Sequence, residues 1–219
     1  MHASFDRVSW FYDPLARLTF GGAIQKSQVT LLSFIPAEAS VLLVGGGTGW
    51  LLRDFARLSI PLNITYLELS PRMLNTAKKT LASIPSHLLQ VDFRQGNETN
   101  ISAHEIFDII LTPFVLDLYP EPLANAMVQR LQRHLKKNGL WLIADFFIDK
   151  TQKNRHKWWK NILLQAMYTF FGWLCDLQTH TLPHLDRLFQ QQLGQLIHTQ
   201  YFYGHFIRSQ VYCYTRQRM

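Results

Sequence analysis

Apolar runs alternate with amphipathic stretches through residues 39–150. The runs that predict buried strands are 41–44, 64–69, 107–111 and 140–147, with a half-buried strand at 88–94. The stretches with helical spacing are 48–58, 71–84 and 123–136. Asn138-Gly139 is expected to stop the last of these helices. Alternating strands and helices predict a parallel sheet with right-handed crossovers.

The two ends of the chain have a different character. Residues 1–38 are predicted to be helical up to Pro36, and 183–193 form a predicted helix. Two strand-like runs, 196–203 and 206–215, follow with a connection so short that they must pair antiparallel. We predict an α/β fold: a Rossmann-like doubly wound sheet, mostly parallel with a C-terminal antiparallel hairpin, plus N-terminal helices and a helical insertion after the fifth strand.

Composition narrows the class of protein. Hydrophobic residues make up 47% of the chain and charged residues 17%, which indicates a globular domain. The net charge of +7 is spread along the sequence, so we expect a solvated basic surface rather than a nucleic-acid or membrane patch. No segment resembles a signal peptide or a membrane span, which favours a cytoplasmic protein. Neither the two cysteines nor His180 and His184, which Pro183 separates, have metal-site spacing, so no metal is expected.

A glycine-rich loop is the strongest chemical signal. Gly45, Gly46, Gly47, Thr48 and Gly49 follow the first predicted strand and precede a predicted helix. Glycines there allow a sharp turn and let a ligand approach the backbone.

The spacing of the loop distinguishes between ligands. A dinucleotide site has G-x-G-x-x-G, but its third glycine falls here on Trp50 or Leu52. No Gly-Lys-Ser/Thr follows either, so the pattern favours an adenosine ligand without a phosphate chain. Glu68 ends the second strand, where an acid can accept hydrogen bonds from both ribose hydroxyls. Leu69 is placed to pack on an adenine face.

These segments resemble the class I S-adenosylmethionine (SAM)-dependent methyltransferases over nearly the whole chain. The segments that carry the resemblance are VLLVGGGTGW, TYLELSPRML, VDFRQGNE, FDIILTPFVLDLYP and LKKNGLWLIADF. The N-terminal SFDRVSWFYDPLARL is similar to the opening of small-molecule methyltransferases such as the ubiquinone/menaquinone C-methyltransferases. The resemblance implies one domain, 1–219, with a lid at 1–38, a SAM-binding core at 39–150, an acceptor cover at 151–194 and a hairpin at 195–219.

The resemblance also implies roles for individual residues. Gly45, Gly47 and Gly49 would line the methionine and ribose of SAM, and Glu68 would bind the ribose hydroxyls. The other positions implied to contact the cofactor are Gly46, Thr48, Leu69, Asn97 near the adenine amino group, Thr112 and Pro113 beside the transferring methyl, and Tyr12 in the lid.

One position departs from the family pattern. The family usually has an acid two residues before the first glycine, where this chain has Leu43. Because that acid helps to hold the loop and the methionine amino group, a methyltransferase-like protein with weak or no SAM binding is one alternative function.

The acceptor is less defined. Nucleic-acid amino-methyltransferases have Asn/Asp-Pro-Pro-Tyr/Phe after the fourth strand, whereas this chain has Thr112-Pro113-Phe114. We therefore favour a small, apolar methyl acceptor and retain an RNA-modifying enzyme as the other alternative. Asp117 and Asp145 follow the fourth and fifth strands and are candidates for a base or an acceptor-orienting group; loop or capping acids are the plainer reading.

The segment 158–173 is apolar around its whole predicted helix. Such a helix is compatible with burial in a core or dimer interface, with an apolar acceptor pocket, or with contact to a membrane surface. We expect it to cover the carboxyl ends of the fourth and fifth strands.

Overall fold

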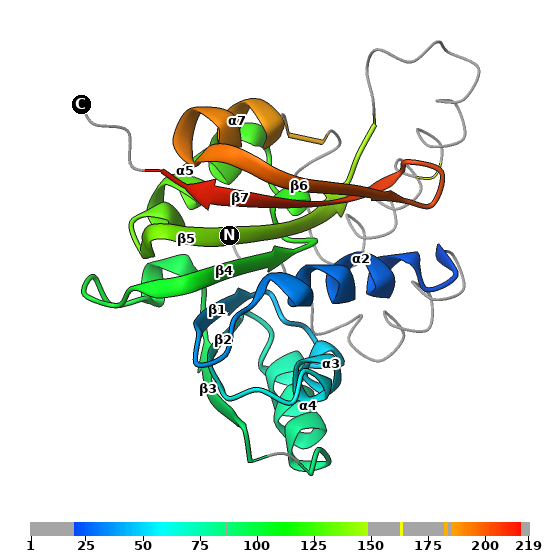
Figure 1. The fold of residues 1–219 in the computed structure, drawn as a ribbon, viewed down its shortest axis with the longest axis vertical. Helices are drawn as coiled ribbons and strands as arrows, with labels where there is room; N and C mark the ends of the chain where they lie inside the picture. The colour runs from blue at the N-terminus through cyan, green and yellow to red at the C-terminus, as the bar shows by residue number, and fades with distance from the viewer. Residues whose placement is uncertain (1–19, 86, 149–162, 164–181, 184, 216–219) are drawn as a thin grey trace.

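The protein is built on one seven-stranded sheet with strand order β3-β2-β1-β4-β5-β7-β6. The computed structural model describes residues 20–85, 87–148, 163, 182–183 and 185–215 (Figure 1). The strands are β1 Ser40–Val44, β2 Leu62–Glu68, β3 Leu89–Gln95, β4 Phe107–Pro113, β5 Leu135–Phe146, β6 Gly194–Phe202 and β7 Ile207–Tyr214. β1 to β5 pair in parallel, while β7 is antiparallel to both β5 and β6, so the predicted fold and hairpin are confirmed.

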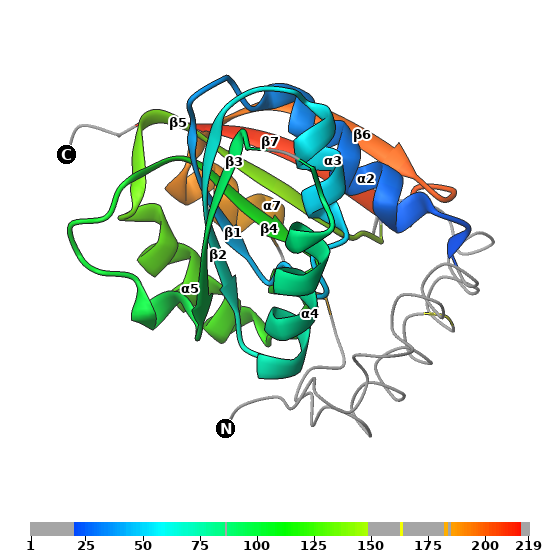
Figure 2. The same ribbon diagram turned by 90° about the horizontal axis from the view of Figure 1, so that it is seen from below.

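Helices cover both faces of the sheet (Figure 2). Helices α2 (Ala23–Leu31), α3 (Leu51–Arg57) and α4 (Pro71–Ala82) pack on one face, and α5 (Glu121–Gln132) and α7 (Leu185–Gln192) on the other. The central strand β1 sends Val41 and Leu43 into the first layer and Leu42 and Val44 into the second. Burial on both faces is why this strand has a continuous apolar run in place of an alternating one.

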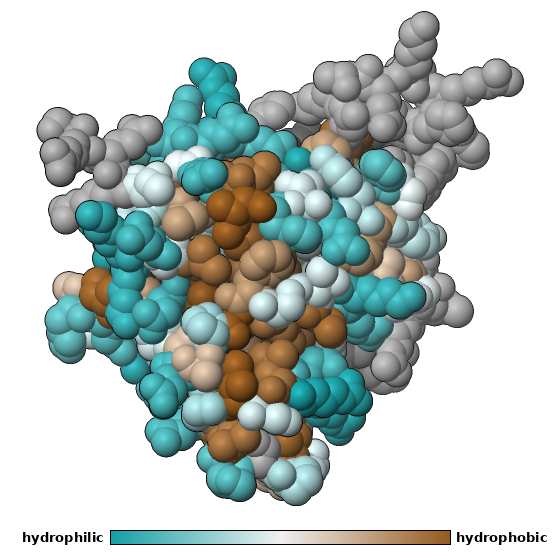
Figure 3. Space-filling view, in the orientation of Figure 1, coloured by the Kyte–Doolittle hydropathy of each residue, from teal (hydrophilic) through white to brown (hydrophobic). Residues whose placement is uncertain are grey.

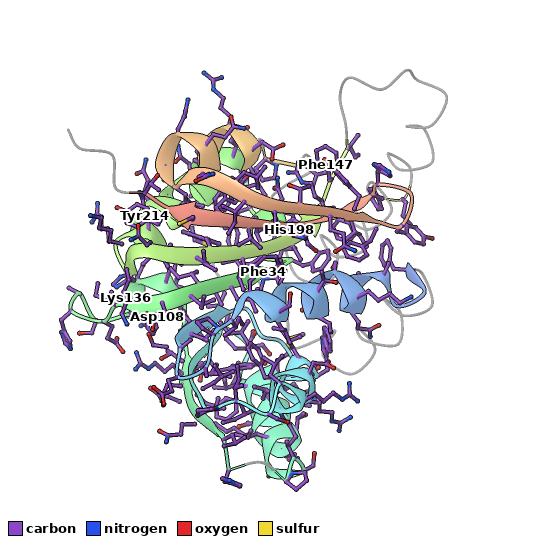
Figure 4. The ribbon with its side chains drawn as sticks, viewed as in Figure 1. Phe34, Asp108, Lys136, Phe147, His198 and Tyr214 are labelled. Carbon is purple, nitrogen blue, oxygen red and sulfur yellow. The ribbon has the colours of Figure 1, made fainter. Side chains whose placement is uncertain are left out.

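The N-terminal helical region packs across the C-terminal hairpin. After α2, a short 3-10 helix, η2 (Leu32–Phe34), brings the Phe34 ring to 4.9 Å from the His198 ring of β6 (Figure 4). Ser209 of β7 donates a hydrogen bond to the Ser27 carbonyl of α2, 2.6 Å away. The two ends of the described chain are therefore held together on one face of the sheet.

The predicted end of the fourth-strand crossover helix is wrong. Helix α5 ends at Gln132, and Leu135 already pairs with Phe107 at the start of β4. Lys136 lies in β5, where its ammonium group donates to the Asp108 carboxylate at 2.8 Å (Figure 4). Asn138 has a left-handed φ of 63° beside a register shift between β4 and β5. The Asn-Gly pair thus shapes an irregularity inside a strand, because pairing with β4 overrides the local helix-stop signal.

The surface at the hairpin edge is partly apolar. Apolar residues cross the middle of the face shown in Figure 3, with hydrophilic residues at its margins. The edge strand β6 exposes Leu196 and Ile197 by 39% and 45%. Within the described residues, no helix is both long and apolar enough to cross a membrane.

Three aromatic side chains join α7 to the sheet. Phe189 of α7 is fully buried, with its ring centroid 5.2 Å from that of Trp141 on β5 and 4.9 Å from that of Tyr212 on β7. The Trp141 indole N–H donates to the Thr112 hydroxyl at 2.9 Å, which satisfies its polar group inside the core. This cluster connects α7, β4, β5 and β7.

We expect Phe189→Ala to lower the free energy of unfolding by about 3–5 kcal/mol, because the substitution leaves a cavity between Trp141 and Tyr212. Urea denaturation of the whole chain measures the change. Leu123→Ala, at a residue 53% exposed on α5, is the control and should change the same quantity by less than about 0.5 kcal/mol. Equal effects of the two substitutions would contradict the packing described.

Candidate functional site

The glycine loop connects β1 to α3 at the carboxyl edge of the sheet. Gly45, Gly47 and Gly49 have φ angles of 69°, 63° and 80°, in the left-handed region that favours glycine. The alternating positive angles turn the chain sharply within five residues. The backbone therefore needs glycine at these positions whether or not a ligand is bound.

The four glycines differ in their surroundings: three are closely packed against neighbouring residues, and one is accessible to a ligand. A Cβ at Gly45 would overlap Val115, one at Gly46 would overlap the Tyr66 ring, and one at Gly49 would lie 2.7 Å from the backbone of Ala77. A Cβ at Gly47 would meet no described atom within 4 Å. Gly47 therefore faces open space, and this is the side from which a ligand can approach the loop.

Two side chains of β2 form hydrogen bonds with the backbone of Gly47, one with its N–H and one with its carbonyl oxygen. Its N–H donates to Glu68 Oε2 at 2.9 Å, and the Tyr66 hydroxyl donates to its carbonyl oxygen at 3.0 Å. The other carboxyl oxygen of Glu68 accepts the Ser70 N–H at 2.9 Å, at the start of α4. Glu68 is buried, so these charge-assisted bonds are shielded from water and fix the carboxylate beside the loop.

Tyr66 pairs with Leu43, the residue at which the family resemblance implies an acid. Leu43 is fully buried and is the direct pairing partner of Tyr66 in the β1–β2 register. Directly paired residues project on the same face of a sheet, so Tyr66 occupies the neighbourhood of residue 43 and reaches the loop from there. Sequence reasoning missed Tyr66, because a tyrosine in an apolar strand has the pattern of a core residue.

Asn97 follows β3 and lies next to the end of β2, since the N–H of Gly96 donates to the Glu68 carbonyl at 3.0 Å. The side-chain oxygen of Asn97 accepts both the N–H and the hydroxyl of Thr99, at 3.0 and 2.6 Å. It therefore caps the short helix η3 (Glu98–Asn100), and any bond to an adenine amino group must be made alongside these two.

The end of β4 meets the glycine loop through Val115, which contacts Gly45. Thr112 is fully buried, and its hydroxyl accepts the indole N–H of Trp141, so its side chain is part of the core. Pro113 is the last residue of β4.

Tyr119, which sequence reasoning also missed, is mostly buried. Burial and the charges of Glu98 and Glu68 raise the pKa of its phenol. Tyr119 therefore lies near the Glu68 carboxylate.

Asp117 and Asp145 are brought together at the carboxyl edge. Asp117 lies on η4 (Leu116–Leu118) and Asp145 near the end of β5, with exposures of 2% and 5%. Burial raises the pKa of Asp117 to about 7. Burial, followed by the charge of Asp117, raises the pKa of Asp145 well above its ordinary value, although Arg208 opposes this shift. The charge of each carboxyl group therefore affects the protonation of the other, which the sequence analysis did not predict.

Several predicted features lie outside the described residues. They are Tyr12, the aromatic segment 158–173 apart from Leu163, and His180 and His184. Leu163 packs against the core layer formed by α2, α3 and α4. Among the described residues, no group of three or more His, Cys, Asp or Glu side chains could hold a metal ion.

Comparison with known proteins agrees with this geometry. Residues 41–139 match the family described as a methyltransferase domain. The malonyl-[acyl-carrier protein] O-methyltransferase of Halalkalibacterium halodurans is 32% identical over 108 residues, which are 49% of this chain but only 39% of that protein.

Solved structures share the fold at low sequence identity. A methyltransferase in complex with the Trm112 activator from Haloferax volcanii has a TM-score of 0.70 and 13% identity, covering 99% of this chain and 100% of the other. The 1,6-didemethyltoxoflavin-N1-methyltransferase of Burkholderia thailandensis, solved with S-adenosylhomocysteine, has a TM-score of 0.63 and 16% identity over 96% of this chain and 86% of that one.

The sheet order, the terminal hairpin and the glycine loop define a Rossmann-like methyltransferase fold. The similarity to methyltransferase domains lies in residues 41–139, which include the glycine loop and Glu68. The loop has room for a ligand at Gly47, because the glycine leaves space where a side chain would otherwise stand.

We expect Gly47→Val to abolish binding of S-adenosylhomocysteine, because the added side chain enters the open space beside the loop. The φ of 63° at this residue also strains the variant, so its melting temperature should fall while the chain stays folded. Calorimetric titration measures binding, and circular dichroism measures folding. Gly49→Val is the matched comparison and should lower the melting temperature more, since its Cβ would lie 2.7 Å from Ala77. Normal binding by folded Gly47→Val would show that the ligand does not approach there.

The buried carboxyl pair should make stability depend on pH. The folded chain holds a proton on Asp117 up to about pH 7, whereas the unfolded chain releases it near its ordinary pKa of 3.8. This contribution to stability is therefore fully present below about pH 4 and is lost as the pH rises through about 7. In thermal melts, Asp117→Asn should gain stability relative to the parent across that window. A difference that is constant with pH would contradict the shifted pKa.

Proposed function

We propose that this protein transfers a methyl group from SAM to a small, apolar acceptor. The observation that carries the proposal is the open face of Gly47 beside a buried glutamate, at the edge where the strands of a doubly wound sheet end. Ligands of such sheets bind beyond the carboxyl ends of the strands. A loop without phosphate-binding spacing suits adenosine and a methionine chain in place of a pyrophosphate.

The proposed cofactor contacts follow from these positions. Gly45, Gly47 and Gly49 would line the methionine and ribose. Glu68 would accept the ribose hydroxyls in addition to its two backbone donors, since an ionised carboxylate offers about four acceptor sites. Leu69 would pack on the adenine. The remaining proposed contacts are Gly46, Thr48, Asn97, Thr112, Pro113 and Tyr12, of which Thr112 would contribute only its backbone because its hydroxyl serves the core.

A small acceptor is supported by similar structures whose named substrates are small molecules. These include the didemethyltoxoflavin enzyme and the magnesium protoporphyrin IX methyltransferase of Synechocystis. The segment 158–173 is proposed as the cover of the acceptor, and Asp117 and Asp145 as the acids that face it. Asp117 and Asp145 both lie at the carboxyl edge of β4 and β5.

The absence of an acid at residue 43 favours a second candidate, a methyltransferase-like protein that binds SAM weakly or not at all. Tyr66 and Glu68 speak for the first candidate, because they hold the loop in an ordered shape without that acid. If the chain does bind SAM, groups other than an acid at residue 43 would bind the methionine amino group.

Titration with SAM and S-adenosylhomocysteine tests the proposal. Glu68→Ala should weaken binding of both by about 1–3 kcal/mol, the scale of lost charge-assisted hydrogen bonds. Asp92→Ala, at an exposed acid of the neighbouring strand β3, is the control and should bind normally. Unchanged affinity in folded Glu68→Ala would remove Glu68 from the site, and no binding by the parent chain would favour the second candidate. A labelled-methyl screen of metabolite extracts then identifies the acceptor.

A further inference from the structure

The ring of Tyr66 is held in place by packing on two sides. It is fully buried in the core layer formed with helices α2, α3 and α4. Its ring centroid lies 5.1 Å from that of Phe93 on β3. On the other side Gly46 passes so close that a Cβ on this residue would overlap the tip of the ring. Packing therefore directs the hydroxyl to the carbonyl oxygen of Gly47, 3.0 Å away.

The place of Tyr66 in the sheet links it to the missing acid. Its direct partner on β1 is Leu43, where the family resemblance implies an acid that helps to hold the loop. The hydrocarbon side chain of Leu43 forms no hydrogen bond, whereas the phenol paired with it does. A neutral hydroxyl with a bound acceptor also costs less in this apolar layer than an ionised carboxylate would. The two positions together supply a polar contact to the loop without a charge at residue 43.

Tyr66 and Glu68 fix the two peptide groups of Gly47. The N–H on one side of its Cα donates to Glu68 Oε2 at 2.9 Å, and the carbonyl on the other side accepts the Tyr66 hydroxyl. These bonds set both backbone angles of a residue that has no Cβ to limit them. Because the loop is anchored at both ends, in β1 and α3, rotation of that carbonyl is compensated at φ, which turns the N–H relative to Glu68.

The carboxylate of Glu68 is therefore coupled to the Tyr66 hydroxyl through Gly47. Its other oxygen accepts the N–H of Ser70 at the start of α4, so one backbone donor remains when the bond to Gly47 is lost. One donor fixes the position of a carboxylate less closely than two. A ligand that binds to Glu68 would then pay to order a group that the parent chain holds in advance.

We propose that Tyr66 is a positioning residue for the cofactor, and that its hydroxyl takes the place of the acid at residue 43 by acting through Gly47 on the carboxylate of Glu68. The inference rests on the proposed binding of SAM and names a further residue on which that binding depends. Tyr66 touches no cofactor atom in this arrangement, because its ring is buried beneath the loop and its hydroxyl is bound to the loop backbone.

Titration of the full chain with S-adenosylhomocysteine tests the inference. Tyr66→Phe keeps the ring and removes only the hydroxyl, and we expect it to raise the Kd by about threefold to tenfold, the scale of one neutral hydrogen bond. Tyr212→Phe is the matched control, since it makes the same change at a fully buried tyrosine in the other core layer. This control should keep the affinity of the parent, whatever its melting temperature.

A double variant separates positioning from core packing. If Tyr66 acts through Glu68, then Tyr66→Phe should have little further effect on the Kd in a chain that already carries Glu68→Ala. If Tyr66→Phe is poorly folded, Gly46→Ala makes the same test, because its Cβ would displace the ring. Gly46 has no left-handed φ, so its backbone accepts alanine.

Three results would overturn the inference. They are an unchanged Kd in the folded Tyr66→Phe or Gly46→Ala chain, an equal loss of affinity in Tyr212→Phe, and effects of Tyr66→Phe and Glu68→Ala that are fully additive. The parent chain is titrated first. Failure of the parent to bind S-adenosylhomocysteine is a separate result, and it counts against the proposed function itself.

Discussion

The site depends on the way β2 holds one glycine. Gly47 is bound through its N–H by Glu68 and through its carbonyl by Tyr66, with both bonds near 3 Å. A loop of glycines has more conformational freedom to lose than any other segment, so an ordered shape needs such restraints. The restraints come from β2, an interior strand that pairs with β1 on one side and β3 on the other. The open face of the loop is therefore shaped before a ligand arrives, which lowers the cost of binding.

Much of this architecture could be predicted from sequence, because the patterns involved are local. Some signals depend only on residues a few positions apart. They include the apolar run at β1, the glycines after it and Pro71 at the start of α4. The end of α5 could not be predicted, since it is set by the pairing of Leu135 with Phe107, which lies 28 positions earlier. Tyr66 and Tyr119 were missed for the same reason, as their partners are distant in sequence and their residue type suggests only packing.

For Asp117 and Asp145, the sequence predicts the place in the fold but not the surroundings of the side chains. Their positions after neighbouring strands place them at one edge of the sheet, but their burial and the effect of each on the pKa of the other depend on side-chain positions that no periodicity encodes. Burying two acids side by side opposes folding, and an apolar pair of similar size would pack there more favourably. Departures of this kind from good packing concentrate at functional sites. The Phe189 cluster follows ordinary packing rules, and the indole N–H of its Trp141 donates to the Thr112 hydroxyl.

The pairing of Leu43 with Tyr66 has a consequence for how this sequence can change. An acid introduced at residue 43 would be enclosed by the same apolar layer that now holds the tyrosine ring. A smaller residue at 66 would release the Gly47 carbonyl before any acid was present to replace that restraint. Each single substitution is therefore unfavourable on its own, and the effect of a change at residue 43 depends on which residue stands at 66.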